Sequence, residues 1–189
     1  MLNTPMDRKI ISLLVDNHSG VLARVSSLFC RRGFNIDSLT VSTTNDPTIS
    51  RITLTVHNDE KVLNQIILQT ARLVETKQIF VLDEHNSMQR ELLLLKVAAN
   101  DQNRVALREI CDIYKGKIID LSRDSMVFEL TGKPSKIDAF LEMFEDYTIL
   151  EMCRTGVTAM ERGGMHQHMQ KPAEHASEAQ MKLLGICLD

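Results

Sequence analysis

The sequence contains no long hydrophobic run. No apolar segment in its 189 residues approaches the roughly 18–20 residues that a helix needs to span a bilayer. The N-terminal segment, MLNTPMDRK, lacks the apolar core of a secretory signal. We therefore expect a cytoplasmic protein that has no membrane partner.

Cysteine is sparse, and no two cysteines form a C-x-x-C pair. The four residues are widely scattered, at Cys30, Cys111, Cys153 and Cys187. Such spacing argues against a disulfide framework. Because two of the four lie within apolar helical patterns, we expect small buried thiols in a reducing cytoplasm.

An excess of basic charge is also missing. The net charge is −3, and residues 1–84 carry nine basic against nine acidic side chains. A broad nucleic-acid-binding surface would show a basic excess, so we expect no nucleic-acid partner. The adjacent basic pair Arg31-Arg32 falls at a predicted helix end, where cations complement the helix dipole.

Motifs that carry catalysis are absent as well. The chain has no G-x-S-x-G elbow, no G-x-x-x-x-G-K-[ST] loop, no H-E-x-x-H and no paired His–Cys constellation. We therefore predict no catalytic residue, which argues against a complete enzyme. A His- and Met-containing stretch around His166 and His168 resembles a metal-binding tract, but it lies in a polar segment and we predict no metal site.

What the chain does contain is typical of a soluble globular protein. Apolar residues make up 43% and charged residues 25% of the sequence. A chain of 189 residues can form one large domain or two small ones, each with its own core.

The first half alternates between strand and helix patterns. Ser50–Val56 alternates apolar and polar residues, which predicts an antiparallel strand in a sheet with one covered face. Apolar residues at helical spacing from Val21 to the stop at Gly33 predict a helix. The other predicted elements are strands at Ile10–Val15, Phe34–Thr43 and Gln78–Leu82, and a helix that Asn58 or Asp59 caps. This βαββαβ order predicts a four-stranded antiparallel sheet with two helices on one face.

The second half repeats this order after a polar linker at residues 85–89. Its predicted elements are strand Glu91–Ala99, helix Arg104–Tyr114, strands Lys117–Leu121 and Ser125–Leu130, helix Ser135–Phe144 and strand Ile149–Cys153. The predicted fold class is therefore α+β, with two consecutive ferredoxin-like βαββαβ units at residues 8–84 and 90–163. Residues 164–189 form a polar tail that we expect to be mobile, with a short helix at 181–188 as one option.

The turn from Asp16 to Gly20 joins the first predicted strand to the first predicted helix. Backbone N–H groups at a helix N-terminus have no intrahelical partner and attract anions. Glycine at this turn admits a close backbone approach, so we predict that it binds the carboxylate of a small amino acid. The equivalent turn of the second half, Asn100 to Arg104, carries Asp and lacks Gly. We therefore expect the ligand in the first half.

Two segments together carry a resemblance to a known family. RRGFNIDSLTV (Arg31 to Val41) and DPTISRITL (Asp46 to Leu54) resemble the ACT domain that opens the small, regulatory subunit of acetolactate synthase. RELLLLKV, TGKPSKIDAF and RTGVTAMERG in the second half are similar to that family too. The resemblance extends over residues 8–163, where it implies an N-terminal ACT domain and a C-terminal ferredoxin-like domain.

The resemblance implies a set of effector-binding residues. Asn17 and Gly20 would belong to the turn that binds the ligand, and Val21 and Leu22 would offer N–H groups to its carboxylate. Asn35, with Ile36 beside it, would face the ligand from a second protomer and accept a hydrogen bond from its ammonium. His18 and Ser19 stand where the family has acidic and Pro or Ser residues in this turn.

The resemblance also implies partners. We expect a homodimer through the ACT domain, bound to the large catalytic subunit of acetolactate synthase, in the synthesis of valine, leucine and isoleucine. Valine or another branched-chain amino acid would inhibit the complex, and this chain would activate its partner. Thiamine diphosphate, Mg²⁺ and FAD are expected on the partner, and no cofactor on this chain.

Several interpretations stay open at this point. Gly20 could serve only as a turn glycine, Asn35 could pair with its own backbone, and Val21, Leu22 and Ile36 are expected to be partly core. A different functional class is a stand-alone tandem-ACT amino-acid sensor that controls transcription or another pathway. A nucleic-acid-binding segment or a basic surface would favour that class.

Overall fold

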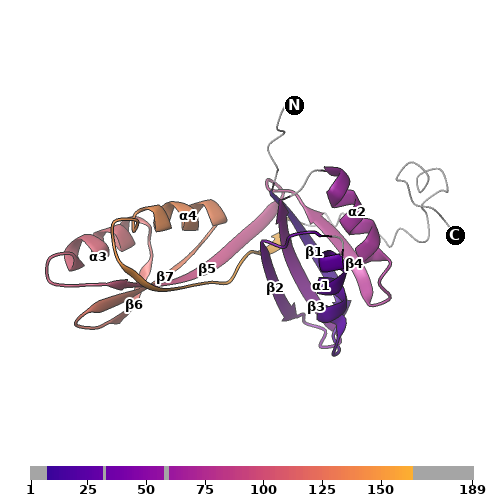
Figure 1. The fold of residues 1–189 in the computed structure, drawn as a ribbon, viewed down its shortest axis with the longest axis horizontal. Coiled ribbons are helices and arrows are strands. Elements are labelled where there is room, and N and C mark those ends of the chain that lie inside the picture. Colours follow the sequence, from indigo (N-terminus) through magenta and orange to yellow (C-terminus); the bar gives the residue numbers. More distant parts are fainter. Residues whose placement is uncertain (1–7, 32, 58–59, 164–189) are drawn as a thin grey trace. The chain divides into compact units, whose positions relative to one another are not determined.

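A computed structural model describes residues 8–31, 33–57 and 60–163 of the chain (Figure 1). These residues form two compact units. The first holds the described residues up to Asn86 together with Glu161–Gly163, and the second spans Ser87–Met160. The predicted tail, with Cys187 and the His- and Met-containing stretch, lies outside the described residues.

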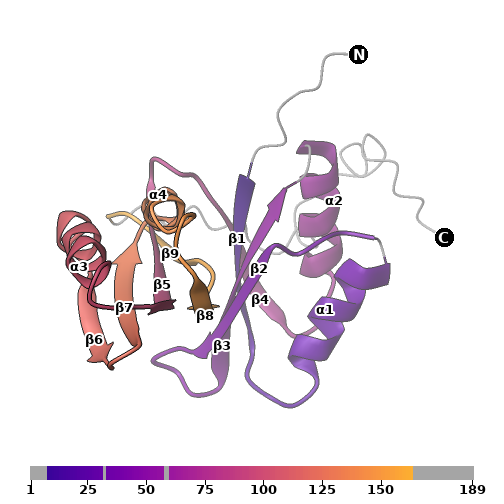
Figure 2. The same cartoon turned by 60° about the vertical axis from the view of Figure 1, so that its left-hand side comes forward.

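The first unit is a four-stranded antiparallel sheet with two helices on one face (Figure 2). Its elements are β1 (Arg8–Asp16), α1 (Val21–Arg31), β2 (Ser38–Thr43), β3 (Ile49–His57), α2 (Glu60–Ala71) and β4 (Thr76–Leu82). The strand order is β2-β3-β1-β4, which places β2 at one edge. The predicted βαββαβ order and layer arrangement are confirmed.

The core of this unit lies between the sheet and the helices. Residues two apart on β1 and β3 point to this side because side chains alternate along a strand. The buried set is Ile11, Leu13 and Val15 of β1, Ile52, Leu54 and Val56 of β3, Val21, Val25 and Phe29 of α1, and Leu63, Ile66 and Ile67 of α2. Burying each large apolar side chain contributes about 1.5–3 kcal/mol.

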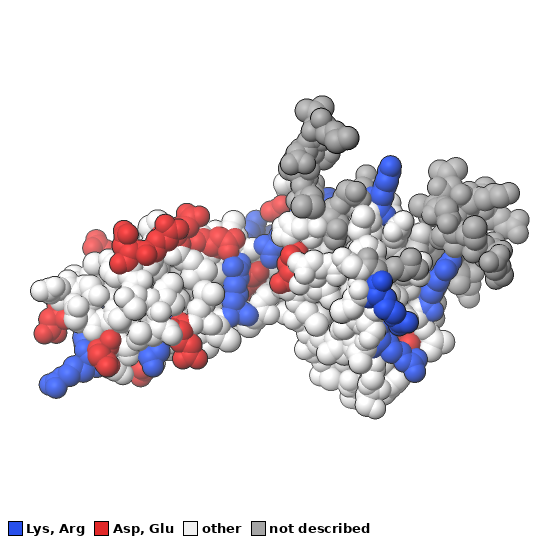
Figure 3. All heavy atoms as spheres, viewed as in Figure 1, with Lys and Arg blue, Asp and Glu red and all other residues white. Residues whose placement is uncertain are grey.

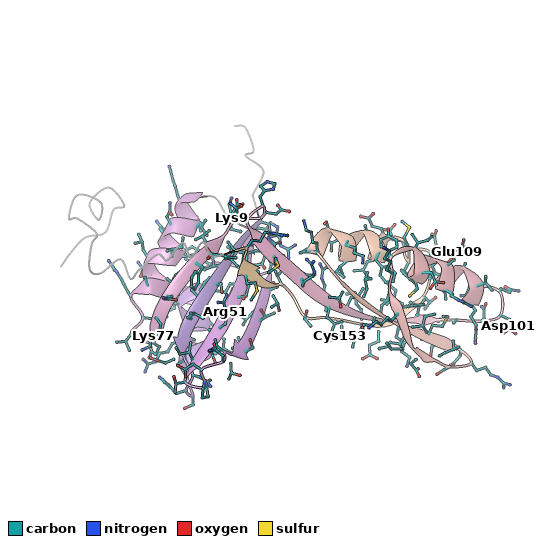
Figure 4. The ribbon with its side chains drawn as sticks, turned by 180° about the vertical axis from the view of Figure 1, so that it is seen from behind. Lys9, Arg51, Lys77, Asp101, Glu109 and Cys153 are labelled. Carbon is teal, nitrogen blue, oxygen red and sulfur yellow. The ribbon has the colours of Figure 1, made fainter. Side chains whose placement is uncertain are left out.

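The expectation of a single covered face is wrong at the centre of this sheet. Ser12, Thr53 and Thr55, which point away from the helices, are at most 2% exposed. Arg51 lies over the strands on that side (Figure 4), where its guanidinium donates to Ser12 Oγ at 3.2 Å and stands 5.6 Å from the ring of Phe80. Small hydroxyl side chains are thus covered by larger neighbours on the same face.

The helix α1 ends in a closed turn that delays the next strand. Phe34 N donates to Phe29 O and Gly33 N to Cys30 O, which is the Schellman pattern, with Gly33 at a φ of 67°. Gly33 and Phe34 therefore donate their N–H groups to the last turn of the helix instead of to a strand. This explains why β2 begins at Ser38 rather than at the predicted Phe34.

The second unit repeats the same arrangement with one extra strand. Its elements are β5 (Ser87–Ala98), α3 (Arg104–Ile113), β6 (Lys117–Leu121), β7 (Ser125–Gly132), α4 (Pro134–Glu142), β8 (Ile149–Arg154) and β9 (Thr158–Glu161). The strand order is β6-β7-β5-β8, and β9 also pairs with β5. β9 was not among the predicted elements. β5 begins inside the segment predicted as a linker, because its pairing with β9 extends the strand beyond the predicted start.

Aromatic rings dominate the core of the second unit. Phe128, Phe140 and Phe144 are fully buried, with ring centroids 4.8 Å apart for Phe140 and Phe144. Tyr114 packs against Phe140 and donates to Ala139 O at 3.0 Å, so its hydroxyl is paired. Acidic side chains gather over the outer surface of the helices of this unit in the view of Figure 3.

The helix α3 ends at a residue that is not glycine. Lys115 has a φ of 55°, and the bonds from Gly116 N to Cys111 O and from Lys115 N to Asp112 O close the helix. The left-handed residue that closes the helix is therefore Lys115, one position before Gly116. Gly116 is needed for space instead, because a Cβ there would lie 3.0 Å from Cys111 Sγ.

The cysteines differ in exposure. Cys111 is buried, and burial, with a smaller effect of the Asp112 charge, raises the pKa of its thiol. Cys30 and Cys153 are exposed, the latter on the edge strand β8 (Figure 4). The expectation of buried thiols is therefore right for Cys111 and wrong for Cys30, because Cys30 lies on the outer side of α1.

Candidate functional site

The turn between β1 and α1 has the backbone geometry of an anion site. Gly20 has a φ of 90°, and a Cβ built on it would meet nothing within 4 Å. The first intrahelical bond runs from Arg24 N to Gly20 O at 3.0 Å, so the N–H groups of Val21, Leu22 and Ala23 precede the helical ladder. The first turn of α1 contains no acidic side chain that could occupy them.

Asn17 holds this turn against the loop that joins β2 to β3. Its N–H donates to Thr48 O at 2.7 Å, and its Nδ2 donates to Pro47 O at 2.8 Å. Its Oδ1 accepts a hydrogen bond from Ser50 Oγ at 3.0 Å. Both ends of the amide are thus paired within the chain, and Asn17 shapes the turn.

A second set of contacts fixes the turn to the start of β4. Asp16 N donates to Glu75 O at 2.9 Å, and Lys77 Nζ lies 2.9 Å from Asp16 Oδ1. Arg24, one turn into α1, forms an ion pair with Glu75, whose side chain is only 6% exposed. The turn is therefore held at both ends before any ligand arrives.

The predicted residues at the helix start face different ways. Val21 is 3% exposed and belongs to the core, so that only its N–H is available to a ligand. Leu22 is 41% exposed, which leaves its apolar side chain beside the turn. Val21 N lies 3.5 Å from His18 O, a long and weak contact.

Asn35 and Ile36 lie at the opposite end of the same helix. α1 has eleven residues and is therefore about 16 Å long. One chain thus brings Asn17, Gly20, Val21 and Leu22 together but leaves Asn35 and Ile36 away from them. Asn35 is exposed, and Ile36 packs partly against the core.

The Asn35 side chain is paired with a neighbour that the sequence analysis did not single out. Asn35 Nδ2 donates to Asp37 Oδ1 at 3.2 Å, and Asp37 Oδ2 lies 2.7 Å from His57 Nδ1. Asp37 could have been noticed from its i+2 spacing to Asn35. The contact with His57 could not have been noticed in the sequence, because only the pairing of β2 with β3 brings His57 close to Asp37.

The loop next to Asn17 carries a perturbed carboxyl group. Asp46 accepts hydrogen bonds from the hydroxyl and the N–H of Thr48, which lower the pKa of its side chain. A lowered pKa means that this contact is complete above the ordinary carboxyl pKa and is lost as the pH falls through the lowered value.

The corresponding turn of the second unit pairs three of its N–H groups with its own side chains. Asn100 Oδ1 accepts from the N–H of Gln102 and of Asn103, at 2.9 and 3.0 Å. Asn103 Oδ1 accepts from Asn100 N at 2.8 Å. These bonds lie before α3, and Asn103 makes no side-chain cap bond to the first turn of that helix. The second turn therefore differs from the first in being closed by its own asparagine side chains.

In the described part of the chain, no group of three His, Cys, Asp or Glu side chains is arranged to hold a metal ion. None of its helices has the length and apolar character needed to cross a membrane.

Two protein-family models match the chain, one in each unit. The model described as "AHAS small subunit-like ACT domain" matches residues 11–78. The model described as "Small subunit of acetolactate synthase" matches residues 90–163.

Matches to similar proteins cover most of the chain. A protein of Archaeoglobus fulgidus named "Probable acetolactate synthase small subunit" is 46% identical over 153 residues, which are 81% of this chain and 96% of that protein. The acetolactate synthase isozyme 3 small subunit of Escherichia coli K12 is 41% identical over 157 residues, 82% of this chain and 96% of that protein. The crystal structure of the acetolactate synthase small subunit from Thermotoga maritima matches with a TM-score of 0.78 and 37% identity, over 84% of this chain and 99% of that one. The chain therefore belongs to the acetolactate synthase small-subunit family.

Proposed function

We propose that this chain regulates a catalytic acetolactate synthase subunit in response to a branched-chain amino acid bound between two copies of the chain. It activates the catalytic subunit and makes it sensitive to feedback inhibition by valine or a close relative. Family membership supports the partnership, and the geometry around α1 supports the effector site.

The separation of the two ends of α1 carries this proposal. The turn at Gly20 offers N–H groups to a carboxylate, and Asn35 offers an amide oxygen to an ammonium, but about 16 Å of helix separates them. The two charged groups of an α-amino acid stand only a few ångströms apart. One chain therefore supplies one half of the site, and a second copy supplies the other.

The edge strand β2 supports the pairing of two copies. It stands at the end of the strand order, so one side of its backbone has no partner strand within the described part of this chain. Leu39 and Val41, which lie on one face of β2, are 36% and 44% exposed. Edge strands with exposed apolar residues are prone to pair with another chain.

The chemistry of the site favours a small aliphatic amino acid. A carboxylate at a helix N-terminus gains about 0.3–2 kcal/mol from the dipole without any arginine. The exposed side chain of Leu22 and the partly buried Ile36 offer apolar contacts to an aliphatic side chain. One methylene changes affinity by only about 1–3 kcal/mol, so titration must decide among valine, leucine and isoleucine.

The effector acts through a difference in affinity for two states of the assembly. A ligand that binds both states equally shifts nothing. Coupling of about 1–3 kcal/mol, which is typical of allosteric proteins, would change activity several-fold to a hundredfold. The proposal places thiamine diphosphate, Mg²⁺ and FAD on the catalytic partner, where thiamine diphosphate would supply the carbon–carbon bond chemistry.

Reconstitution tests this function directly. The chain is mixed with its catalytic subunit, and acetolactate formation is measured with and without valine, leucine or isoleucine. We expect the chain to raise the rate and at least one of these amino acids to lower it. If the rate neither rises nor responds to any of the three, the proposed function is wrong.

The stand-alone sensor is less well supported. The view in Figure 3 shows acidic side chains along the helices of the second unit and only scattered basic ones on the first. The second unit also matches the acetolactate synthase model. Co-purification with DNA, or with a partner other than a thiamine enzyme, would favour the sensor instead.

A further inference from the structure

We propose that Asp37 is a positioning residue, which orients the amide of Asn35 so that the site prefers ligands that carry an ammonium group. This inference rests on the proposed function, because it concerns the half of the effector site that the second copy supplies. It assigns a role to a carboxylate outside the predicted effector-binding residues.

The hydrogen bond between Asn35 and Asp37 decides which way the amide points. An ionised carboxylate only accepts hydrogen bonds. The atom of Asn35 that lies 3.2 Å from Asp37 Oδ1 is therefore the NH₂ group, and the amide oxygen is turned to the other side. An oxygen can accept a hydrogen bond from an ammonium, whereas an NH₂ group in the same place would oppose it.

Asp37 is itself held by β3 from two directions. Its N–H donates to Thr55 O at 2.9 Å, which fixes the backbone. Its second carboxylate oxygen lies 2.7 Å from His57 Nδ1. With one oxygen bound to His57, the other is kept toward Asn35, so the carboxylate cannot turn away without losing a contact.

The repeat offers an internal comparison. Asp120 follows Ile118 and Ile119 in the sequence as Asp37 follows Asn35 and Ile36, but it lies inside β6 rather than before the strand. Asp120 Oδ2 is 3.4 Å from Ser122 Oγ, a local contact at the end of β6. The second unit thus keeps the acidic residue but has no amide for it to orient, which makes Asp120→Ala a matched control.

The experiment compares two ligands that differ only in the ammonium. The full chain and four variants, Asp37→Ala, Asp120→Ala, Asn35→Ala and the Asp37→Ala/Asn35→Ala double variant, are titrated with valine and with 3-methylbutanoate. Ligand-observed NMR detects the weaker acid. We expect Asp37→Ala to lower the affinity for valine about tenfold, as for loss of a hydrogen bond to a charged group, and to leave 3-methylbutanoate unchanged. Asp120→Ala should change neither, and the double variant should match Asn35→Ala.

Three outcomes would overturn this inference alone, and a fourth would overturn the proposed function as well. An equal loss for both ligands would mean that Asp37 only supports the local structure. A loss that is as large in the Asn35→Ala background would place Asp37 in direct contact with the ligand. An unchanged valine affinity in Asp37→Ala would remove its role altogether, while the proposed function stands because the parent chain still binds valine. Absence of valine, leucine and isoleucine binding in the parent chain would overturn both.

Discussion

At the scale of single residues, the proposed ligand site depends on the backbone conformation of Gly20. Its φ of 90° is costly for any residue with a Cβ, by about 1–2 kcal/mol. The space around it is open, so substitution acts through backbone strain and through whatever the new side chain adds at the helix N-terminus.

Gly20→Asp should abolish effector binding without unfolding the chain. Its carboxylate would reach the same N–H groups that the ligand carboxylate uses, because Asp is a favoured N-cap acceptor. Calorimetric titration with branched-chain amino acids measures the loss. Gly20→Ala is the matched control, since it carries the same strain without the charge, and should retain weakened binding. Equal binding by Gly20→Asp and the parent chain would contradict the site.

Lys115→Gly should stabilise the second unit by about 0.5–1 kcal/mol. Lys115 has a positive φ at the end of α3, a position that glycine occupies with less strain. The chain has no tryptophan, and both tyrosines, Tyr114 and Tyr147, lie in the second unit. Tyrosine fluorescence during urea unfolding therefore reports on that unit.

Lys133→Gly is the control for this substitution. Lys133 precedes α4 with an extended backbone at a φ of −65°, where glycine relieves nothing. It should lower stability slightly. A destabilised Lys115→Gly would mean that the lysine side chain contributes more than its backbone strain removes.

At the scale of whole elements, one arginine joins strands β5 and β8 to helix α4. Arg154 forms an ion pair with Glu91, whose side chain is 1% exposed, and its second nitrogen lies 2.7 Å from Asp138 Oδ1. Burial alone would lower the pKa of Arg154, but the hydrogen bonds and charges of Glu91 and Asp138 outweigh it and raise this pKa. Arg154 therefore stays charged at every physiological pH.

Arg154→Leu should destabilise the second unit by about 3 kcal/mol, because it removes the ion pair that Arg154 makes with the buried carboxylate of Glu91. Urea unfolding followed by tyrosine fluorescence measures the change. Arg108→Leu is the comparison, since the Arg108–Asp112 pair is exposed on both sides and contributes under about 1 kcal/mol. Similar losses for the two variants would show that burial of Glu91 adds nothing.

At the scale of the whole molecule, the proposed site belongs to a pair of chains. In a two-fold dimer each of two equivalent sites takes its turn from one chain and its amide from the other. Damage to different halves in different chains therefore leaves one site complete.

Heterodimers of Gly20→Asp with Asn35→His should recover binding that neither variant has alone. Co-expression with two affinity tags and sequential purification isolates them. Titration should give about half the parent stoichiometry, because one site is intact and the other carries both substitutions. Dimers of either variant with itself provide the control and should bind nothing. No recovery in the heterodimer would place both halves of the site in one chain.

Much of this molecule follows from local sequence pattern. The strict alternation of Ile52, Leu54 and Val56 is sufficient to predict β3, since the period of a strand does not depend on its neighbours. The stop at Gly33 predicts the end of α1, and the contrast between Gly20 and the Asn100 turn favours the first unit for the proposed anion site. β9 was not predicted because its four residues are too few to show a clear alternation of apolar and polar side chains.

The contacts between distant residues were decided by tertiary structure alone. Local pattern indicates that Asn17 and Asn35 flank a helix, but not that Ser50 and Pro47 pair with Asn17 or that His57 holds the carboxylate of Asp37. Strand pairing sets those distances, and no local periodicity encodes them. The sequence by itself determined the two βαββαβ units and the family. The fold decided that α1 separates Gly20 from Asn35, because a helix of eleven residues holds its ends about 16 Å apart, and this separation is the reason for proposing that a second copy completes the site.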